Sequence, residues 1–244
     1  MQRFTKAITA IMLMMAGYII AGCTKPDNPS NGGSNNGGNG DNSISGHEYV
    51  DLGLPSGTLW ATCNVGANAP EEYGDYFAWG EVRPKTVYNW STYQHCYGSV
   101  TTLIKYCGHD IFGYNGFTDG LKILLSEDDA ATANWGNDWR MPTKEEWEEL
   151  KSNSTIIWTT QNGVNGWRFT AMNGNMLFLP AAGYRDDSNL EIVGSFGIYW
   201  SSSLHDAYTG SAWYFKLHSV SCIMEYSIRC SGLSVRPVCS ECKN

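Results

Sequence analysis

The chain has 244 residues, a net charge of −8 and 13% aromatic residues. A chain this acidic lacks the Lys and Arg surplus that neutralises phosphates, so we expect no nucleic-acid partner. The aromatic content argues against disorder over most of the chain, and no apolar run beyond the N-terminus could span a bilayer. These properties exclude a histone-like protein, a coiled coil and a polytopic membrane protein, and they favour one globular domain.

The N-terminus is first basic and then apolar. Arg3 and Lys6 precede the apolar run, which ends in Ala21-Gly22-Cys23. This order is typical of a signal peptide, and the small residues before the cysteine resemble a bacterial lipobox. We predict that residues 1–22 are removed and that Cys23 carries acyl chains such as palmitate, which makes the membrane one partner. An ordinary signal peptide with an accidental cysteine is the alternative.

Residues 23–43 consist mostly of Gly, Asn, Ser, Pro and Asp after the cysteine, with no large apolar residue before the segment's end. Such a composition cannot bury enough surface to fold and predicts a flexible, disordered tether. Thr24 stands where an Asp would retain a lipoprotein at the inner membrane, so we predict an outer-membrane lipoprotein. The sequence leaves open whether it faces the cell surface or the periplasm. The globular domain then covers residues 44–239, and residues 240–244 form a tail.

The domain begins with a predicted hairpin. Residues 47–54 alternate as a strand, Pro55-Ser56-Gly57 forms a turn, and residues 59–65 form the second strand. A long aromatic, glycine-rich stretch follows from Tyr73 to Phe117 with few periodic patterns. We expect this stretch to be rich in loops.

Two helices are predicted next. Ser126 opens a capping box before residues 130–135, and Gly136 stops that helix. Thr143 opens a second box, in which Trp147 and Leu150 form the apolar face. The remaining predicted strands are 167–170, 176–180, 198–203, 212–217, 220–223 and 234–239. Two short helices with many strands indicate an α+β domain.

Eight cysteines are present, and seven remain after Cys23. An exported protein lies in an oxidising compartment, so we expect disulfides. Cys96 and Cys107 could close a local loop, and Cys222 and Cys230 could pair across a hairpin. If the first and last strands are neighbours, Cys63 and Cys239 could link the two ends of the domain. Cys242 is then left over, the connectivity stays open, and the single C-x2-C pattern at Cys239 lacks a second ligand pair for zinc.

Several segments between residues 47 and 239 resemble one family as a set. They are YVDLGLPSG (49–57), WATCNVG (60–66), YFAWGE (76–81), WRMPT (139–143), EW (146–147), LPAAGYR (179–185), YWSSS (199–203) and SVRPV (234–238). This set resembles the Fibrobacter succinogenes major paralogous domain, which occurs in secreted and lipid-anchored proteins of Bacteroidetes-type bacteria. The fourth, fifth and last segments also resemble formylglycine-generating enzymes. The resemblance implies a C-type lectin-like fold, with mostly antiparallel strands, two short helices and long loops that bind ligands.

In that fold the N- and C-terminal strands pair, which supports the link between Cys63 and Cys239. The enzymes of the formylglycine type bind copper through two cysteines five positions apart. Here Cys222 and Cys230 stand eight apart, and their surroundings do not match. We therefore expect no catalysis, and a cysteine- or metal-dependent modifying enzyme is the alternative.

Calcium is the metal that lectins use, and it needs several converging oxygens. The sugar-binding motifs Glu-Pro-Asn and Gln-Pro-Asp are absent. One oxygen-rich run is the calcium candidate, with a solvated turn as the alternative. This run contains Asp186, Asp187, Asn189 and Glu191. We expect neither another metal nor a cofactor.

Two further patterns contain residue types that are used in catalysis or ligand binding. Ser203 and His205 share one face of a strand, but neither an orienting acid nor a G-x-S-x-G turn accompanies them. Arg140, Arg185 and Arg236 lie within the family segments. We interpret these arginines as internal brackets, by which we mean side chains that bind nearby acids or backbone carbonyls of the same domain. The alternative is that they bind the carboxylate of a ligand.

Aromatic residues in the loop-rich stretch are the candidate ligand-binding residues. They are Trp79, Tyr88, Trp90, Tyr93, Tyr97, Tyr106 and Tyr114. Flat rings with polar rims stack on sugars and anchor interfaces, whereas packing in the core is the alternative. We predict a non-catalytic lipoprotein whose domain binds a glycan or a protein without calcium. A structural surface component is a further alternative, and the sequence settles neither the ligand nor the oligomeric state.

Overall fold

Strands dominate residues 42–240, the part of the chain that the computed structural model describes. The predictions of a signal peptide, of lipidation at Cys23, of most of the tether and of a spare Cys242 lie outside these residues. Within residues 42–240, no helix has the length and apolar character needed to cross a bilayer. The sheets are largely antiparallel and the helices few, which is compatible with the α+β class.

The first sheet joins the two ends of the domain. Its strand order is β1 (Ser43–Ile44), β2 (His47–Asp51), β3 (Thr58–Ala61) and β14 (Val238–Ser240). In this sheet β3 pairs with β2 on one side and with β14 on the other, both antiparallel. The predicted hairpin is therefore confirmed, with shorter strands than expected. The N- and C-terminal strands are neighbours, as the family resemblance implies.

The central sheet has five strands. In order, these are β12 (Ser221–Ile228), β11 (Ser211–His218), β10 (Phe196–Leu204), β13 (Leu233–Ser234) and β4 (Tyr76–Phe77). Successive side chains of a strand point to opposite faces. In β10 this places Trp200 in one buried hydrophobic cluster and Tyr199 in another. The strand therefore separates two halves of the core.

The remaining strands form a third sheet and a separate two-stranded hairpin. The sheet contains β5 (Ser154–Gln161), β6 (Val164–Ala171) and β7 (Met176–Pro180), and the hairpin contains β8 (Tyr184–Asp186) and β9 (Asn189–Glu191). The sequence predicts β7 with its observed bounds and β6 with shorter ones, and it misses β5, β8 and β9. The predicted strand at 234–239 is two short strands, β13 and β14.

The helices begin at side-chain caps. In α2 (Lys144–Ser152), the Thr143 hydroxyl accepts from the Glu146 backbone N–H and the Glu146 carboxylate accepts from the Thr143 N–H, as the capping box predicts. Trp147 and Leu150 are buried on its inner face. The helix α1 (Ala130–Trp135) is capped by Asp129 instead of Ser126, because residues 126–128 form a separate 3-10 turn.

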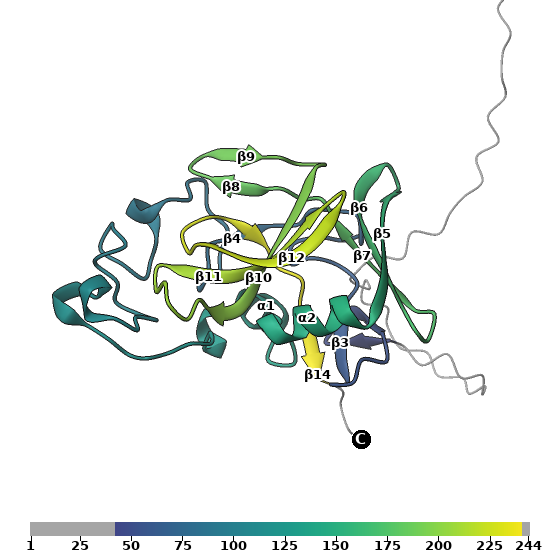
Figure 1. Cartoon of the computed structure of the whole chain (residues 1–244), viewed down its shortest axis with the longest axis horizontal. Coiled ribbons are helices and arrows are strands. Elements are labelled where there is room, and N and C mark those ends of the chain that lie inside the picture. The colour runs from purple at the N-terminus through teal and green to yellow at the C-terminus, as the bar shows by residue number, and fades with distance from the viewer. Residues whose placement is uncertain (1–41, 241–244) are drawn as a thin grey trace, which may run out of the picture.

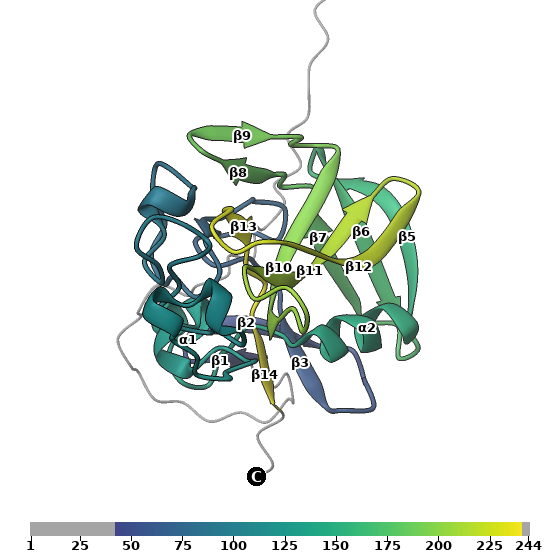
Figure 2. The same cartoon turned by 60° about the vertical axis from the view of Figure 1, so that its left-hand side comes forward.

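The loop-rich stretch lies on one side of the central sheet. Figure 1 shows residues 80–125, in blue to teal, on the side opposite β5, β6 and β7, and Figure 2 shows the same separation after a turn of 60°. Between residues 80 and 125 the regular structure is three 3-10 turns, at Trp90–Thr92, Asp110–Phe112 and Tyr114–Gly116. The prediction of a long loop region is confirmed, and these loops lie beside β11 and β12, where the candidate site forms.

Candidate functional site

Four of the seven predicted ligand-binding aromatics belong to the core. Trp79, Tyr88, Tyr93 and Tyr106 are all buried, with at most 3% of their surface exposed. Their polar atoms bond inside the protein: Trp79 Nε1 donates to the Ser201 carbonyl at 2.8 Å, and the Tyr93 hydroxyl donates to the Trp79 carbonyl at 2.7 Å. The ligand-binding prediction is wrong for Trp79, Tyr93 and Tyr106, because few aliphatic residues are available nearby and these rings fill the interior under the loops. Tyr88 is also buried, but it contributes to the wall of a cavity that is described below.

The other three aromatics reach the surface in two places. Tyr97 and Tyr114 are 64% and 45% exposed, and their rings meet edge to face with centroids 4.6 Å apart. Trp90 is half-buried and lines a different feature, a pocket against the central sheet. The predicted set therefore divides into a core group, a surface pair and one pocket residue.

The pocket that contains Trp90 is built from three parts of the chain. Its volume is about 370 Å³, and it is lined mainly by aromatic and aliphatic side chains. The lining residues are Trp90, Val100, Phe112, Tyr208, Gly210, Ser211, Tyr226 and Ile228. The first three come from the loop region, the next three from the β10–β11 turn and the start of β11, and the last two from β12. We call this feature the aromatic pocket.

Two exposed rings form one wall of the aromatic pocket. Tyr208 and Tyr226 are 54% and 47% exposed, and their rings lie nearly parallel, 27° apart, with centroids 5.5 Å from each other. The ring of His205 packs against both, with centroids 5.0 Å and 4.2 Å away. Exposed tyrosine rings that are held from behind can stack on a flat apolar ligand face without losing much conformational entropy.

His205 positions Tyr208 through its backbone. The Nδ1 atom accepts hydrogen bonds from the N–H groups of Ala207 and Tyr208 at 3.2 and 3.0 Å. Burial lowers the pKa of His205, Lys144 and Lys122 act in the same direction, and Asp206 opposes them. The imidazole is therefore neutral at pH 7 and able to accept both bonds. A protonated ring would lose this acceptor, so the turn that carries Tyr208 depends on the neutral form.

Ser203 and His205 do not form a nucleophile and its base. The Ser203 hydroxyl accepts from the Lys144 backbone N–H at 3.1 Å, at the start of α2. The Nδ1 of His205 is engaged by the turn described above. Both side chains therefore have structural partners, and the strand-hydroxyl interpretation of Ser203 agrees with the contacts.

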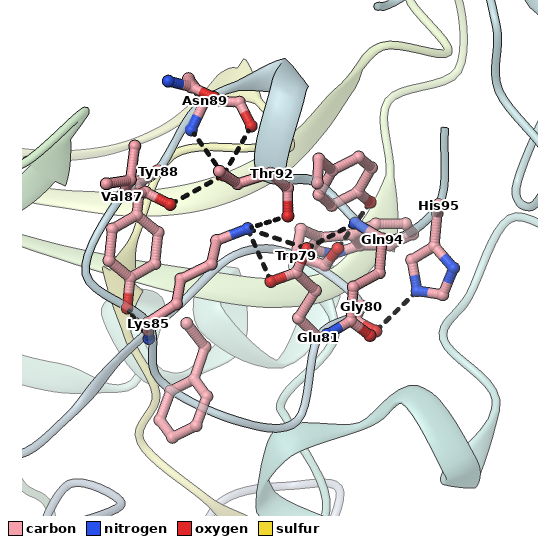
Figure 3. A network of polar contacts seen from close by, with 12 residues as sticks. Trp79, Gly80, Glu81, Lys85, Val87, Tyr88, Asn89, Thr92, Gln94 and His95 are labelled. Carbon is pink, nitrogen blue, oxygen red and sulfur yellow. Dashed lines mark hydrogen bonds and ion pairs between the residues drawn. The ribbon is translucent and has the colours of Figure 1, made fainter. Parts of the chain in front are cut away.

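A buried charged pair fixes the loop that carries Trp90. Glu81 is 1% exposed, and its carboxylate accepts from Lys85 Nζ at 2.9 Å and from the Gln94 backbone N–H at 2.8 Å. Lys85 Nζ also donates to the Thr92 carbonyl at 3.0 Å, so one ammonium joins two ends of the same loop (Figure 3). A hydrogen-bonded ion pair of this kind holds a loop in one geometry. Trp90 is thus presented by a fixed backbone.

The 3-10 turn at Trp90 is also capped. The Asn89 side chain accepts from the Ser91 N–H at 3.0 Å. The Thr92 hydroxyl donates to the Val87 carbonyl at 2.8 Å (Figure 3). Across the pocket, a Cβ on Gly210 would lie 2.4 Å from Val100 Cγ2. Only glycine permits this close approach of the β10–β11 turn to the loop region.

The structure separates Cys222 from Cys230. Cys222 lies near the start of the extended strand β12, and Ile228 ends it, which places these two residues about 20 Å apart. The two residues that follow cannot bring Cys230 back within the roughly 7 Å between Cα atoms that a disulfide allows. The predicted hairpin pair is therefore corrected, because both cysteines lie along one strand direction.

The other two predicted cysteine pairs remain predictions. Cys96, Cys107 and Cys230 carry thiols and lie in one buried cluster, so the pair of Cys96 with Cys107 stays a prediction. Cys63 follows β3 and Cys239 lies in the neighbouring strand β14, and their bridge also stays a prediction. A copper pair made of Cys222 and Cys230 is ruled out by the same separation that rules out their disulfide.

The calcium candidates lie on the β8–β9 hairpin. Asp186 pairs with Asn189 across the strands, and Glu191 pairs with Tyr184. The Asp187 carboxylate accepts from the Asn89 side-chain amide at 2.5 Å, which ties the turn to the loop that carries Trp90. Among residues 42–240, no three His, Cys, Asp or Glu side chains gather as metal ligands do.

Two of the three arginines that the sequence analysis named, Arg140 and Arg236, act as internal brackets. Arg140 binds the Glu146 carboxylate through two nitrogens, at 2.7 and 2.6 Å. Arg236 is fully buried and donates to Asn64 Oδ1 at 2.9 Å and to the Thr62 carbonyl at 2.6 Å. The bracket interpretation is confirmed for these two, whereas the guanidinium of Arg185 has a different environment.

Comparisons of the chain with protein-family models, with curated proteins and with solved structures found no match. The function is therefore inferred from the site alone. The aromatic pocket offers ring faces from Trp90, Tyr208 and Tyr226, and the hydroxyls of the tyrosines and of Ser211 supply polar groups beside them. This combination of flat apolar faces and hydroxyls suits a sugar ring, which has an apolar C–H face and a polar rim.

Proposed function

We propose that this protein is a non-catalytic, lipid-anchored carbohydrate-binding protein of the outer membrane. The observation that carries the proposal is the aromatic pocket, in which the exposed rings of Tyr208 and Tyr226 are held by His205 from behind. The pocket volume, about 370 Å³, is within the range of small-molecule sites. A glycan is preferred over a protein because the site is a small concave pocket, whereas protein partners bind larger surfaces.

The C-type lectin-like fold is part of this proposal. Three features support it: the pairing of β3 with β14, the α2 helix packed on the central sheet, and the long loops on one side of that sheet. The pocket lies where loops meet the sheet, which is the general place for ligand binding on a rigid scaffold. Binding here needs no calcium, because its polar groups are hydroxyls and its main contacts are ring faces.

Lipidation at Cys23 and the tether that follows supply the proposed location. A lipid-anchored domain on a flexible tether reaches ligands near a membrane while staying attached to it. The absence of catalysis is proposed from the engaged Ser203, the engaged Nδ1 of His205 and the separated Cys222 and Cys230. None of these groups is arranged as a nucleophile with its base.

The test is a glycan array probed with the full chain in detergent, with and without EDTA. Tyr226→Ala removes one exposed ring of the pocket, and Tyr97→Ala is the matched control, since Tyr97 is an exposed tyrosine outside it. We expect selective binding that survives EDTA, weakens about tenfold or more in Tyr226→Ala, and is unchanged in Tyr97→Ala. Silence on the array, or equal binding by both variants, would refute the aromatic pocket as a glycan site.

A further inference from the structure

A second cavity lies between the β8–β9 hairpin, the segment that leads into β4 and the loop before Trp90. Its volume is about 490 Å³, and its lining includes Asp75, Tyr76, Lys85, Tyr88 and Arg185. It shares no lining residue with the aromatic pocket. The two features are therefore separate candidate sites on one domain.

The backbone of Arg185 is held on both sides. It pairs with Leu190 across the hairpin, its N–H donates to the Gly232 carbonyl at 2.7 Å, and its carbonyl accepts from the Gly232 N–H at 2.9 Å. The guanidinium carbon lies 5.2 Å from the centre of the Tyr76 ring. This is a cation–π contact, which attracts the guanidinium to the ring without using any of its N–H groups as a hydrogen-bond donor to a protein oxygen.

Arg185 differs from the other family arginines in what it binds. Within the described part of the chain, no carboxylate or carbonyl accepts a hydrogen bond from its guanidinium, whereas Arg140 and Arg236 are both engaged. The side chain is half-buried in the cavity wall, and the described residues supply no acceptor for its donors. A planar guanidinium matches a carboxylate, which it binds through two parallel hydrogen bonds.

The other charges of the cavity narrow the ligand class. Lys85 is already neutralised by Glu81, with Nζ 2.8 Å from the carboxylate, and it offers little to an anion. Asp75 is an exposed residue of the cavity lining, and no side chain among residues 42–240 donates a hydrogen bond to its carboxylate. A carboxylate in this position accepts hydrogen bonds from ligand hydroxyls, whereas a fully ionised inorganic anion offers it no donor. The ligand should therefore carry one carboxylate and several hydroxyls.

We propose that this cavity binds the carboxylate of an acidic sugar. Arg185 binds the ligand carboxylate, and Asp75 accepts from its hydroxyl groups. The proposal rests on carbohydrate binding as the function of the domain and adds acidic glycans as a second ligand class at a second site. It uses residues that the aromatic pocket does not use.

The experiment is a calorimetric titration of the full chain in detergent with glucuronate, galacturonate and N-acetylneuraminate, and with glucose as the uncharged match for glucuronate. Arg185→Gln removes the charge, and Arg83→Gln is the control, because Arg83 is exposed on the neighbouring loop and does not line the cavity. We expect at least one of the three acidic sugars to bind. If glucuronate binds, glucose should bind at least about tenfold more weakly than glucuronate. For the acidic sugar that binds, Arg185→Gln should raise the Kd about tenfold or more, and Arg83→Gln should leave it unchanged.

Two further variants separate this proposal from the first. Arg185→Lys keeps the charge without the two parallel bonds and should bind the acidic sugar with an intermediate Kd. Tyr226→Ala should leave acidic-sugar binding unchanged while it weakens binding at the aromatic pocket. Failure of all three acidic sugars to bind at millimolar concentration, or binding that is unaffected by Arg185→Gln, would overturn the proposal. If only the proposal for the aromatic pocket is wrong, the binding of acidic sugars will still depend on Arg185, and Tyr226→Ala will not weaken the binding of any glycan.

Discussion

The Arg140 guanidinium meets the Glu146 carboxylate edge to edge, with nitrogen–oxygen distances of 2.7 and 2.6 Å. The same carboxylate accepts from the Thr143 N–H at 2.8 Å and from the Thr58 hydroxyl at 3.0 Å. Arg140 in turn pairs through its backbone with Val238. One carboxylate therefore connects the start of α2 with β3 and, through Arg140, with β14.

This connection predicts a pH-dependent effect of Glu146→Gln. Burial alone would raise the pKa of Glu146, but the hydrogen bonds and charge of Arg140 outweigh burial and hold the pKa below its ordinary value. A carboxyl whose pKa is lower in the folded state stabilises the fold above its unfolded pKa, near 4.5, and loses this effect as the pH falls through the folded value. We expect Glu146→Gln to lower the free energy of unfolding by about 2 kcal/mol at pH 7.

Chemical denaturation at pH 7 and at pH 3.5 measures this difference. The difference in the free energy of unfolding between the wild-type chain and Glu146→Gln should be smaller at the lower pH. Glu145→Gln is the control, because Glu145 is exposed on the same helical turn. An equal gap at both pH values would show that the ion pair is not the cause.

Burial of histidines predicts a second dependence on pH. Burial lowers the pKa of His47, His95 and His205. The unfolded chain then binds more protons than the folded one just below pH 6.5, so the free energy of unfolding decreases as the pH falls from 6.5 toward the folded pKa values. We expect lower stability at pH 5.5 than at pH 7.5, before most carboxylates titrate.

Denaturation midpoints at these two pH values test the histidine effect. Replacing His205 by Asn should reduce the difference between them. Replacing the exposed His109 by Asn should leave it unchanged. A difference that is the same in all three proteins would assign the pH dependence to other groups.

The pair of Asn64 and Arg236 predicts a stability effect where the first and last strands of the domain meet. Asn64 is fully buried, and it accepts from Arg236 Nε at 2.9 Å and donates to the Tyr73 carbonyl at 2.9 Å. Asn64→Ala leaves a buried donor on Arg236 and a carbonyl on Tyr73 without their partner. We expect a loss of about 3 kcal/mol in the free energy of unfolding, measured by chemical denaturation. The exposed Asn68→Ala should change it by no more than about 0.5 kcal/mol, and a similar loss in both would contradict the prediction.

The cysteine clusters predict which disulfides form on oxidation. Cys230 shares a buried cluster with Cys96 and Cys107, whereas Cys222 belongs to another. We expect any intramolecular disulfide of Cys230 to join it to Cys96 or Cys107. Peptide mapping of the oxidised chain without reductant identifies the linked fragments, and a linked Cys222–Cys230 fragment would contradict the structure.

Features set by neighbouring residues were predictable from the sequence. The capping box at Thr143, the stop at Gly136 and the first hairpin depend on contacts within a few positions, and all three are present. The hairpin of β5 and β6 was missed although Asn162-Gly163 marks it. These two residues have φ values of 47° and 84°, which is the left-handed backbone that such two-residue turns need.

The candidate site was not predictable in the same way. The aromatic pocket brings Trp90 together with Tyr208 and Tyr226, which lie more than 100 positions away in the chain, and no local spacing reveals such a meeting. The composition of the loop region drew attention to its aromatic residues, of which Trp90 lines the aromatic pocket. It could not distinguish Trp79, which is fully buried, from Trp90, which lines a pocket, because the distinction depends on the sheet behind them.

The pairing of β3 with β14 also determines the order in which the domain can form. Leu59 and Cys239 face each other in this pair although they are 180 positions apart. The N-terminal hairpin therefore lacks its neighbouring strand until β14 has been synthesised, and contacts this distant in sequence form slowly. For a chain exported through a membrane in the unfolded state, as the proposed location requires, late closure delays completion of this sheet until β14 has crossed the membrane.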